Sequence, residues 1–506
     1  MLGRSAWLFV IGALIGAPSC SSTFHPRACA LDADCGTGLV CAEQQGQSTC
    51  KNAGDAPLRI GMSAPVTGAS QDLGIEMKKG VLLAIDQQNA AGGVRGRKIE
   101  LEFRDDEYIP ASAEAAAREL LDVAALTTPA RCPTTTVPVV AGQTPIANGA
   151  LQRGPNAVIG LLGSVGTPTM VRSAPIAVET SSLFFGAFTG AAKVLRDGAA
   201  GACSKYIFNV RASYAQEARA TLEYFLKLRV PDSHHLVSFD QNDTFGQAGY
   251  DGLVAAYIAL KGPITTPFSS DSPIARFRYT RDDATSVPAQ IAATAQYLGQ
   301  VLAADSMPHT VGIFMTDTYG PATSFIKGIR DWQYANDAEQ GMNQKATRLT
   351  LYFSNVSFVG PNSLASRLVA AGSVGTSQGM KPYSDGVFVS QVVPNYQNDN
   401  SDAVRDYRDR LAAAGQDASF TSLEGYLVGR VFAAGLAAHV GPFTPDALVN
   451  TFEKLPPLNL GLGASSGFAP GNHNYSKSVF GTSIGADGTF GNRYFWSDGT
   501  PIQLFE

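Results

Sequence analysis

Short apolar runs and amphipathic helical segments alternate along most of this chain. Residues 58–62 alternate between apolar and other side chains as a strand does, and the segment from Met77 to Ile85 repeats apolar residues at the spacing of one helix face. Apolar positions alternate again through residues 99–103, and an alanine-rich helix is expected at 111–126. This β-α-β-α order predicts a parallel, doubly wound α/β sheet.

Two loops near the middle of the chain carry candidate binding groups. The apolar run 158–162 predicts a buried strand, which leads into the glycine-containing loop of Ser164. The next predicted strand, 183–185, leads into a second glycine-containing loop with Thr189. Because the carboxyl ends of parallel strands share one edge of a sheet, we expect the two hydroxyls to converge there and to suit a small carboxylate. The alternative is that the glycines only shape tight turns.

A second α/β series begins near residue 206. Its strands are expected at 206–211, 236–240, 311–315, 349–353 and 386–393. Its helices are expected at 214–228, 246–260, 289–303, 403–413 and 420–438, and a further helix follows the loop at 316–320 and ends at Ile329. Residues 127–155 read as an insertion between the two series, and the tail from Pro456 predicts terminal strands and hairpins. Two such sheets without a long linker predict two lobes facing across a cleft, the usual place for a small ligand.

Composition narrows the class of protein. The chain has 506 residues, of which 45% are hydrophobic and 16% charged, so it is long enough for two or three globular domains. Its formal net charge is −5 and its Lys and Arg residues are scattered. A nucleic-acid-binding domain would instead show a basic patch. We therefore expect no nucleic-acid partner.

The N-terminus predicts export. Arg4 precedes an apolar segment at 6–17, which is the pattern of a signal peptide covering residues 1–19. The sequence Ala17-Pro18-Ser19-Cys20 resembles a bacterial lipobox, so Cys20 is the expected lipidation site, and plain secretory cleavage is the alternative. No other run is long and apolar enough to predict a membrane span. A lipid on Cys20 would then be the only membrane anchor.

Six further cysteines fit an exported chain. Four of them crowd a polar segment that could not form a core unaided, namely Cys29, Cys35, Cys41 and Cys50. They predict a disulfide-bonded module whose pairing the spacing leaves open. Cys132 and Cys203 could pair with each other. A metal site is not expected, because there is no CxxC spacing and His234-His235 lack partners at ligand-like spacing.

Several different short motifs follow one another from Leu58 to the C-terminus. They are Leu58 to Gly68, Gly163-Ser164, Phe185 to Ala191, Phe208 to Tyr214, Asp243 to Gly246, Ser354 to Gly360, Ser390 to Pro394 and Ser422 to Tyr426. Together they resemble the type I periplasmic solute-binding proteins, specifically the leucine/isoleucine/valine-binding group that serves ABC importers. The resemblance implies two Rossmann-like lobes that are joined by three crossing strands and close like a hinge.

The resemblance also implies a domain division and a set of site residues. After the signal peptide come a Cys-rich tether at 20–57, lobe I at 58–206 and 386–455, and lobe II at 207–385 and 456–506. The implied ligand-binding residues are Ser164, Ala187, Phe188, Thr189, Tyr214, Tyr319, Phe420 and Leu73, with the hydroxyls of Ser164 and Thr189 on the ligand carboxylate. The acidic partner of the ligand ammonium in the family falls at Ser354-Asn355, and neither residue is acidic. Asp317 is the replacement candidate, and a helix cap is the alternative for it.

The expected function is that of a lipid-anchored, periplasmic solute-binding protein of an ABC importer. It would bind a small amino acid or related carboxylate in the inter-lobe cleft, act as a monomer with a membrane permease as partner, and need no cofactor. A ligand-sensing receptor module of the same fold is the alternative. An enzyme is not expected, because Leu162 stands where a GxSxG motif around Ser164 would need glycine. The Gly92-Gly93 pair likewise follows a helix, whereas a phosphate-binding loop follows a strand.

Overall fold

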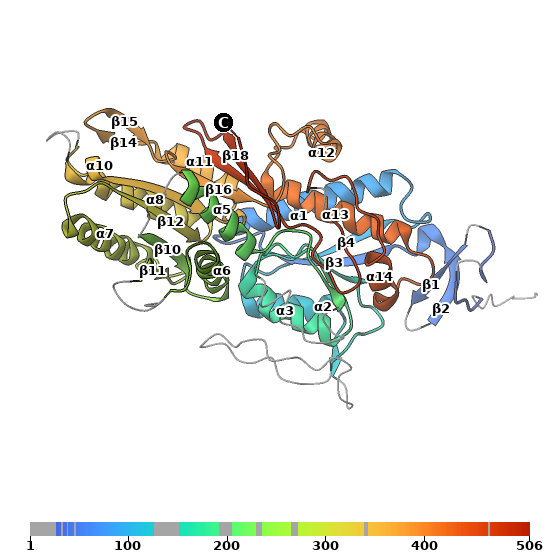
Figure 1. The fold of residues 1–506 in the computed structure, drawn as a ribbon. Helices are drawn as coiled ribbons and strands as arrows, with labels where there is room; N and C mark the ends of the chain where they lie inside the picture. The colour runs from blue at the N-terminus through green and yellow to red at the C-terminus, as the bar shows by residue number, and fades with distance from the viewer. Residues whose placement is uncertain are drawn as a thin grey trace, which may run out of the picture.

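The computed structural model describes residues 27–31, 34–37, 39–44, 47–125, 151–191, 205–228, 235–264, 272–337, 343–463 and 466–505. These residues form two lobes that lie side by side, with a small N-terminal hairpin at the far end of the first lobe (Figure 1). Each lobe is built on a mostly parallel sheet with helices on both faces. The predicted class, two doubly wound α/β lobes after a Cys-rich segment, is confirmed.

Lobe I contains a five-stranded sheet in the order β4-β3-β7-β8-β9, and all its strand pairs are parallel. Its strands are β3 (Leu58–Ala64), β4 (Ile99–Asp105), β7 (Gly160–Leu162), β8 (Leu183–Phe185) and β9 (Ile207–Phe208). Helix α1 (Gln71–Ala90) packs against α13 (Phe420–Ala438), and α2 (Pro110–Leu120) packs against α3 (Thr167–Glu179). The predicted apolar face of α1 is buried from Met77 to Ile85.

Lobe II contains an eight-stranded sheet in the order β11-β10-β12-β13-β16-β17-β18-β19. Its strands are β10 (Leu236–Gln241), β11 (Ile274–Tyr279), β12 (His309–Thr316), β13 (Leu349–Asn355), β16 (Val387–Gln391), β17 (Ser478–Ile484), β18 (Phe490–Ser497) and β19 (Gln503–Leu504). The pairs are parallel up to β16 and antiparallel beyond it. Its main helices are α5 (Tyr214–Leu228), α6 (Thr244–Lys261), α7 (Ser286–Ala304), α8 (Tyr319–Gln333) and α11 (Pro361–Ala371).

Smaller elements complete the described chain. They are α10 (Gln344–Arg348), α12 (Asp402–Ala413), α14 (Pro445–Phe452), the strand pair β5 (Ala124–Ala125) and β6 (Leu151–Gln152), and the hairpin of β14 (Ser373–Thr376) and β15 (Gly379–Pro382). No helix in the described part of the chain combines the length and the apolar character that crossing a bilayer requires.

Strand β11 was not predicted from the sequence. It reads Ile-Ala-Arg-Phe-Arg-Tyr, and two arginines on one face conceal a strand that periodicity would otherwise reveal. The strand lies at the sheet edge, where charged side chains are common. Arg276 and Arg278 both reach the buried carboxylate of Asp240 on β10, so the charges are paired across the strands.

The lobe boundary expected at residue 386 needs a correction. Strand β16 pairs with β13 and β17, so it belongs to the sheet of lobe II, and the chain re-enters lobe I only after residue 391. Strand β9 pairs with β8 and so begins the crossing from within lobe I. The backbone of Asn209 then bonds to His473 and Tyr475, which lays the C-terminal crossing segment beside the first one.

The N-terminal hairpin has a defined disulfide pairing. Strands β1 (Leu39–Gln44) and β2 (Gln47–Asn52) are antiparallel, and the disulfides join Cys29 to Cys41 and Cys35 to Cys50. The structure therefore selects one of the pairings that the spacing left open. Cys20, Cys132 and Cys203 lie outside the described residues, as does most of the expected insertion.

Gly80 on α1 marks the closest approach of two helices in lobe I. A Cβ atom there would lie 1.9 Å from the carbonyl oxygen of Ser422 on α13. We expect Gly80→Ala to lower the free energy of unfolding by about 1–3 kcal/mol, because the helices would have to move apart. Denaturant unfolding measures this loss. Gly299→Ala on α7 has open space around its Cβ and should be neutral or stabilising; equal losses in the two variants would contradict the packing argument.

Candidate functional site

The loops of Ser164 and Thr189 meet at the carboxyl ends of β7 and β8. A parallel bridge joins Val165 to Phe188, and the amide of Phe188 donates to the carbonyl of Ser164 at 2.8 Å. Both hydroxyl residues are buried, with 1% of Ser164 and none of Thr189 exposed. The structure thus places them at one sheet edge, as the strand order requires. Ala187 and Phe188, which the resemblance implies as ligand-binding residues, lie in the second loop, where the Phe188 amide and the Ala187 carbonyl are bonded within the two loops.

The two hydroxyls differ in their hydrogen bonding. Thr189 Oγ1 lies 2.6 Å from Thr167 Oγ1 and donates to the hydroxyl of Tyr214 at 3.3 Å. Tyr214 begins α5, so this bond connects the two lobes. Burial raises the pKa of Tyr214 to about 12, so its hydroxyl stays neutral at physiological pH. Ser164 Oγ has no hydrogen-bond partner among the described residues, although it is buried.

An aromatic cluster fills the space between the lobes at this edge. Phe358 lies in a short helical turn (Ser357–Val359) after β13, and its ring centroid is 4.9 Å from that of Phe188 and 4.8 Å from that of Phe245. Tyr108 of lobe I stacks on the same ring at 6.2 Å. Phe358 therefore packs between side chains of both lobes. The sequence pattern does not single out Phe358, because an apolar residue shortly after a buried strand is typical of any core position.

Tyr108 was also missed by the sequence analysis. It follows the carboxyl end of β4, and both it and Glu107 have positive φ angles, of 63° and 53°. Such conformations are costly for residues with side chains and concentrate at functional sites. Arg281 of lobe II donates to the Tyr108 carbonyl at 2.7 Å and lies over its ring. The Tyr108 hydroxyl is buried and interacts with the side chain of Gln241 in lobe II.

Asp317 lies in lobe II, directly after β12, and is completely buried. Helix α8 is preceded by Thr318 and has no side-chain cap, and neither carboxyl oxygen of Asp317 has a hydrogen-bond partner in the described chain. The cap alternative for Asp317 is therefore wrong. Burial, reinforced by the nearby carboxylate of Asp240, raises the pKa of Asp317 well above its usual value.

This shift gives stability a specific dependence on pH. The folded state keeps the Asp317 proton at pH values where the unfolded chain has lost it, so the free energy of unfolding falls as pH rises above about 4. Asp317→Asn should remove this decline and gain stability relative to wild type between pH 4 and 8. Unfolding curves over that range measure it.

Asp283 provides a control, because its pKa is shifted in the opposite direction from that of Asp317. Hydrogen bonds from the hydroxyl and amide of Thr285 lower the pKa of this exposed carboxylate, so Asp283→Asn should lose stability relative to wild type as pH rises. A stability difference between Asp317→Asn and wild type that does not change with pH would contradict the assignment of a protonated Asp317.

Tyr319 and Leu73 meet at a second contact between the lobes. The Tyr319 hydroxyl donates to the carbonyl of Ala69 at 2.7 Å. Gly360 brings these side chains together, since a Cβ at this position would lie 2.9 Å from both the Leu73 and the Tyr319 side chains. The Tyr319 hydroxyl is thus engaged in lobe-to-lobe bonding.

Phe420 lies in a different aromatic group from the other candidates. Its ring packs edge-on against Tyr396 at 5.0 Å and Phe490 at 4.9 Å. The rings that contact Phe188 and Tyr214 within the described chain do not include Phe420. Phe420 stays a predicted ligand-binding residue whose ring packs in a group apart from Phe188 and Tyr214.

A buried ionic network lies next to the site and was not anticipated. Arg211, just after β9, pairs with Glu217 of α5 at 3.0 Å and with Glu424 of α13 at 3.3 Å. Glu217 also accepts from the Ser357 amide and the Ser390 hydroxyl, each at 2.7 Å. Burial opposes the charge on Arg211, but Glu424 and Glu217 offset it and hold its pKa above the usual value. The network joins both lobes and fixes the turn that carries Phe358.

Comparisons with known proteins agree with this architecture. A model of the periplasmic binding protein family matches residues 57–146. The chain is 38% identical over 66 residues to Leu/Ile/Val-binding protein homolog 3 of Brucella melitensis biotype 1, and 40% identical over 67 residues to an amino acid binding protein of Pseudomonas aeruginosa. Each match covers 13% of this chain and 18% of the relative, so the similarity spans less than a fifth of these curated proteins.

Solved structures extend the similarity over most of the chain. A possible leucine/isoleucine/valine-binding protein from Rhodopirellula baltica SH 1 superposes with a TM-score of 0.67 and 26% identity, covering 87% of this chain and 97% of that one. A branched chain amino acid ABC transporter structure from Thermus thermophilus with bound valine gives a TM-score of 0.59 at 14% identity, covering 89% and 97%. The second likeness is one of fold alone. The other three proteins are named as binding proteins, in agreement with the expectation that the chain is not an enzyme.

Proposed function

Because the chain is a relative of the type I periplasmic binding proteins of the leucine/isoleucine/valine-binding group, we propose that it is an extracytoplasmic solute-binding protein. The family model and the similar proteins confirm the resemblance to the leucine/isoleucine/valine-binding group. We propose further that the ligand is a small amino acid or related carboxylate held where the two lobes meet. The unpartnered Ser164 hydroxyl, buried beside Thr189 at the carboxyl ends of neighbouring strands, is the observation that carries this proposal.

Buried polar groups without partners support a polar ligand. A hydroxyl or carboxyl that loses water without gaining a hydrogen bond costs about 1–3 kcal/mol, so proteins rarely keep one without a purpose. Ser164 Oγ has this character at the contact between the lobes, and the Asp317 carboxyl has it directly after β12 in lobe II. In the proposal, Ser164 and Thr189 donate to the ligand carboxylate. Asp317 faces the ammonium group and gives up its proton when that group binds.

Ligand exchange requires the lobes to separate, because every group named is buried. The contacts that must break include Tyr319 to Ala69, Arg281 to Tyr108 and Ser363 to Asp72, the last at 2.8 Å. A partly buried hydrogen bond of this kind contributes about 1 kcal/mol net, so a ligand that bonds both lobes can shift the balance toward closure. This is the hinge motion that the fold supports.

Native mass spectrometry of the freshly purified full chain tests the proposal. A bound small molecule with an amino-acid or carboxylic-acid mass is the expected result, and Ser164→Ala should carry less of it. An amino acid should release about one proton on binding if Asp317 pairs with the ammonium group, and its des-amino analogue should release none. Calorimetry in buffers of different ionisation enthalpy measures that proton. A wild-type chain that neither carries nor binds such molecules would refute the function.

The cellular setting belongs to the same proposal. Cys20 would carry the lipid anchor in the periplasm, and a membrane permease of an ABC importer would accept the ligand from the monomeric protein. The sensing alternative keeps the ligand site and replaces the permease with a signalling partner. Ligand-stimulated ATPase activity of the transporter in reconstituted vesicles distinguishes the two roles.

A further inference from the structure

Arg330 of α8 is a buried cation without a carboxylate partner in the described chain. Only 2% of the residue is exposed. Its guanidinium donates to the side-chain oxygen of Gln333 at 2.8 Å and to the main-chain carbonyls of Asp385 at 2.7 Å and Leu351 at 3.2 Å, which are all neutral acceptors. Its Nε has no partner among the described residues. Arg211, equally buried, is by contrast neutralised by two glutamates. A buried charge is costly unless it is paired, so Arg330 calls for an anion.

A pocket of about 650 Å³ opens beside Arg330. It lies in lobe II between the first residues of β13 and β16 and the end of β17, and its volume is in the range of small-molecule sites. Tyr352, Phe388 and Ile484 supply apolar walls. Gly386 has φ of 66°, and a Cβ there would lie 3.1 Å from the Arg330 guanidinium, so this glycine leaves the space in front of the charge open.

The charged side chains that line this pocket are mainly cationic. The lining contains three cations, Arg330, Lys381 and Arg493, and one carboxylate, that of Asp385. This excess of positive charge contrasts with the negative net charge of the chain. Lys381 pairs with Asp385 at 2.6 Å. Arg493 donates to the Ser483 hydroxyl at 2.9 Å and has no ion pair within the residues that the structure describes. Two of the three cations are therefore left to attract an anion.

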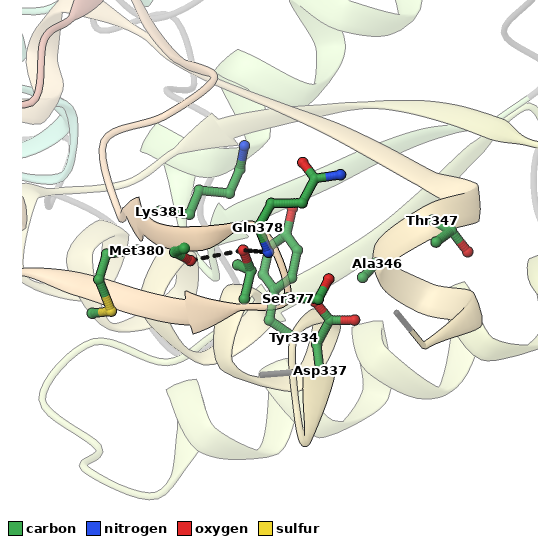
Figure 2. A pocket seen from close by; sticks show the side chains of 10 residues that line it. Tyr334, Asp337, Ala346, Thr347, Ser377, Gln378, Met380 and Lys381 are labelled. Atoms are coloured by element: carbon green, nitrogen blue, oxygen red, sulfur yellow. Dashed lines mark hydrogen bonds between the residues drawn. The ribbon is translucent and has the colours of Figure 1, made fainter. Parts of the chain in front are cut away.

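A second pocket continues from the first under the β14–β15 hairpin. It measures about 480 Å³ and shares Tyr334, Ala346, Gln378 and Lys381 with the larger pocket. Figure 2 shows Gln378 and Lys381 extending to one side of the hairpin and Met380 to the other. Gln378 and Lys381 of the hairpin line both pockets, so their polar groups can contact a molecule bound in the larger pocket.

From these observations we propose that the pocket of Arg330, Lys381 and Arg493 binds a small organic anion with an apolar body, such as a carboxylate with an aromatic or aliphatic group. The guanidinium groups hold the anionic head, and Tyr352 and Phe388 contact the body. This site is separate from the one between the lobes. It lies at the amino ends of β13 and β16, whereas Phe358 and Asp317 follow the carboxyl ends of β13 and β12 at the opposite edge of the sheet.

Ligand-observed NMR and calorimetry with benzoate, octanoate, benzamide and inorganic phosphate test the proposal on the full chain. Benzoate or octanoate should bind, while benzamide, which lacks the charge, and phosphate, which lacks the apolar body, should bind more weakly. Arg330→Gln removes the central charge, but it also removes bonds that hold the chain near residue 385. Arg493→Gln and Lys381→Gln on the rim avoid this risk and should each weaken binding roughly fivefold or more. Lys261→Gln, at an exposed position at the end of α6, makes the same charge change outside the pocket and serves as the control.

The outcomes separate this site from the one between the lobes. Binding that falls in the rim variants and persists in Lys261→Gln and Ser164→Ala supports the proposal. Absence of binding to wild type at millimolar probe would overturn it, as would equal affinities in all variants. Loss of probe binding in Ser164→Ala alone would place the probe between the lobes and would likewise reject the second site, without affecting the proposed function.

Discussion

Arg211→Met should lower the free energy of unfolding by about 3–5 kcal/mol, the cost of leaving buried carboxylates without their cation. Glu217 and Glu424 are fully or almost fully buried, and Arg211 forms an ion pair with each of their carboxylates. Methionine keeps much of the volume of the side chain, so the loss reports charge and hydrogen bonding and not an empty space. Chemical denaturation at neutral pH, followed by circular dichroism, measures it.

Two comparisons make this result interpretable. Arg405→Met on α12 breaks an exposed pair with Asp402 and should cost about 1 kcal/mol or less. Adding Glu217→Gln and Glu424→Gln to Arg211→Met removes the stranded charges and should recover part of the loss. A loss below 1 kcal/mol for Arg211→Met, or no recovery in the triple variant, would show that the network does not hold the lobes.

Phe358→Ala should destabilise the chain by about 3–5 kcal/mol, because a buried aromatic ring is replaced by a cavity. The ring has no exposed surface and contacts Phe188, Phe245 and Tyr108. The same change should enlarge the space between the lobes and favour bulkier ligands. Unfolding by denaturant and a calorimetric comparison of valine with phenylalanine test both effects.

Phe480→Ala provides the matched control for this prediction. Phe480 packs against Phe495 at the partly exposed face of the lobe II sheet, far in the chain from the loops of Ser164 and Thr189. Its removal should cost less, since little buried volume is lost, and ligand preference should stay unchanged. An equal shift in ligand preference in both variants would mean that Phe358 does not border the ligand.

Local pattern was sufficient for most of the architecture. Strands such as β3 and β8 and helices such as α1 and α5 were predicted because their apolar periodicity matches their burial. The meeting of Ser164 and Thr189 followed from strand order alone. Strand β11 was missed because its arginines pair with Asp240 across the sheet, a contact that no local pattern contains.

The composition of the contact between the lobes could not be predicted in the same way. Tyr108, Phe358 and Arg211 come from distant parts of the chain and acquire their roles only when the lobes close. The family resemblance implies Phe420 at the ligand, but no local pattern predicts that its ring packs against Tyr396 and Phe490. Residues on strand ends were therefore easier to place than residues that meet through tertiary packing.

The most direct test of the ligand site is calorimetric titration of wild type, Ser164→Ala and Thr189→Val with leucine, isoleucine and valine, or with the molecule that copurifies. The proposal predicts that each substitution weakens binding by about 1–3 kcal/mol, because each hydroxyl bonds the ligand carboxylate. Ser164→Ala should leave the unfolding midpoint nearly unchanged, whereas Thr189→Val also removes the bonds to Thr167 and Tyr214 and should lower it. Unchanged affinity in both folded variants would contradict a carboxylate held between these two loops.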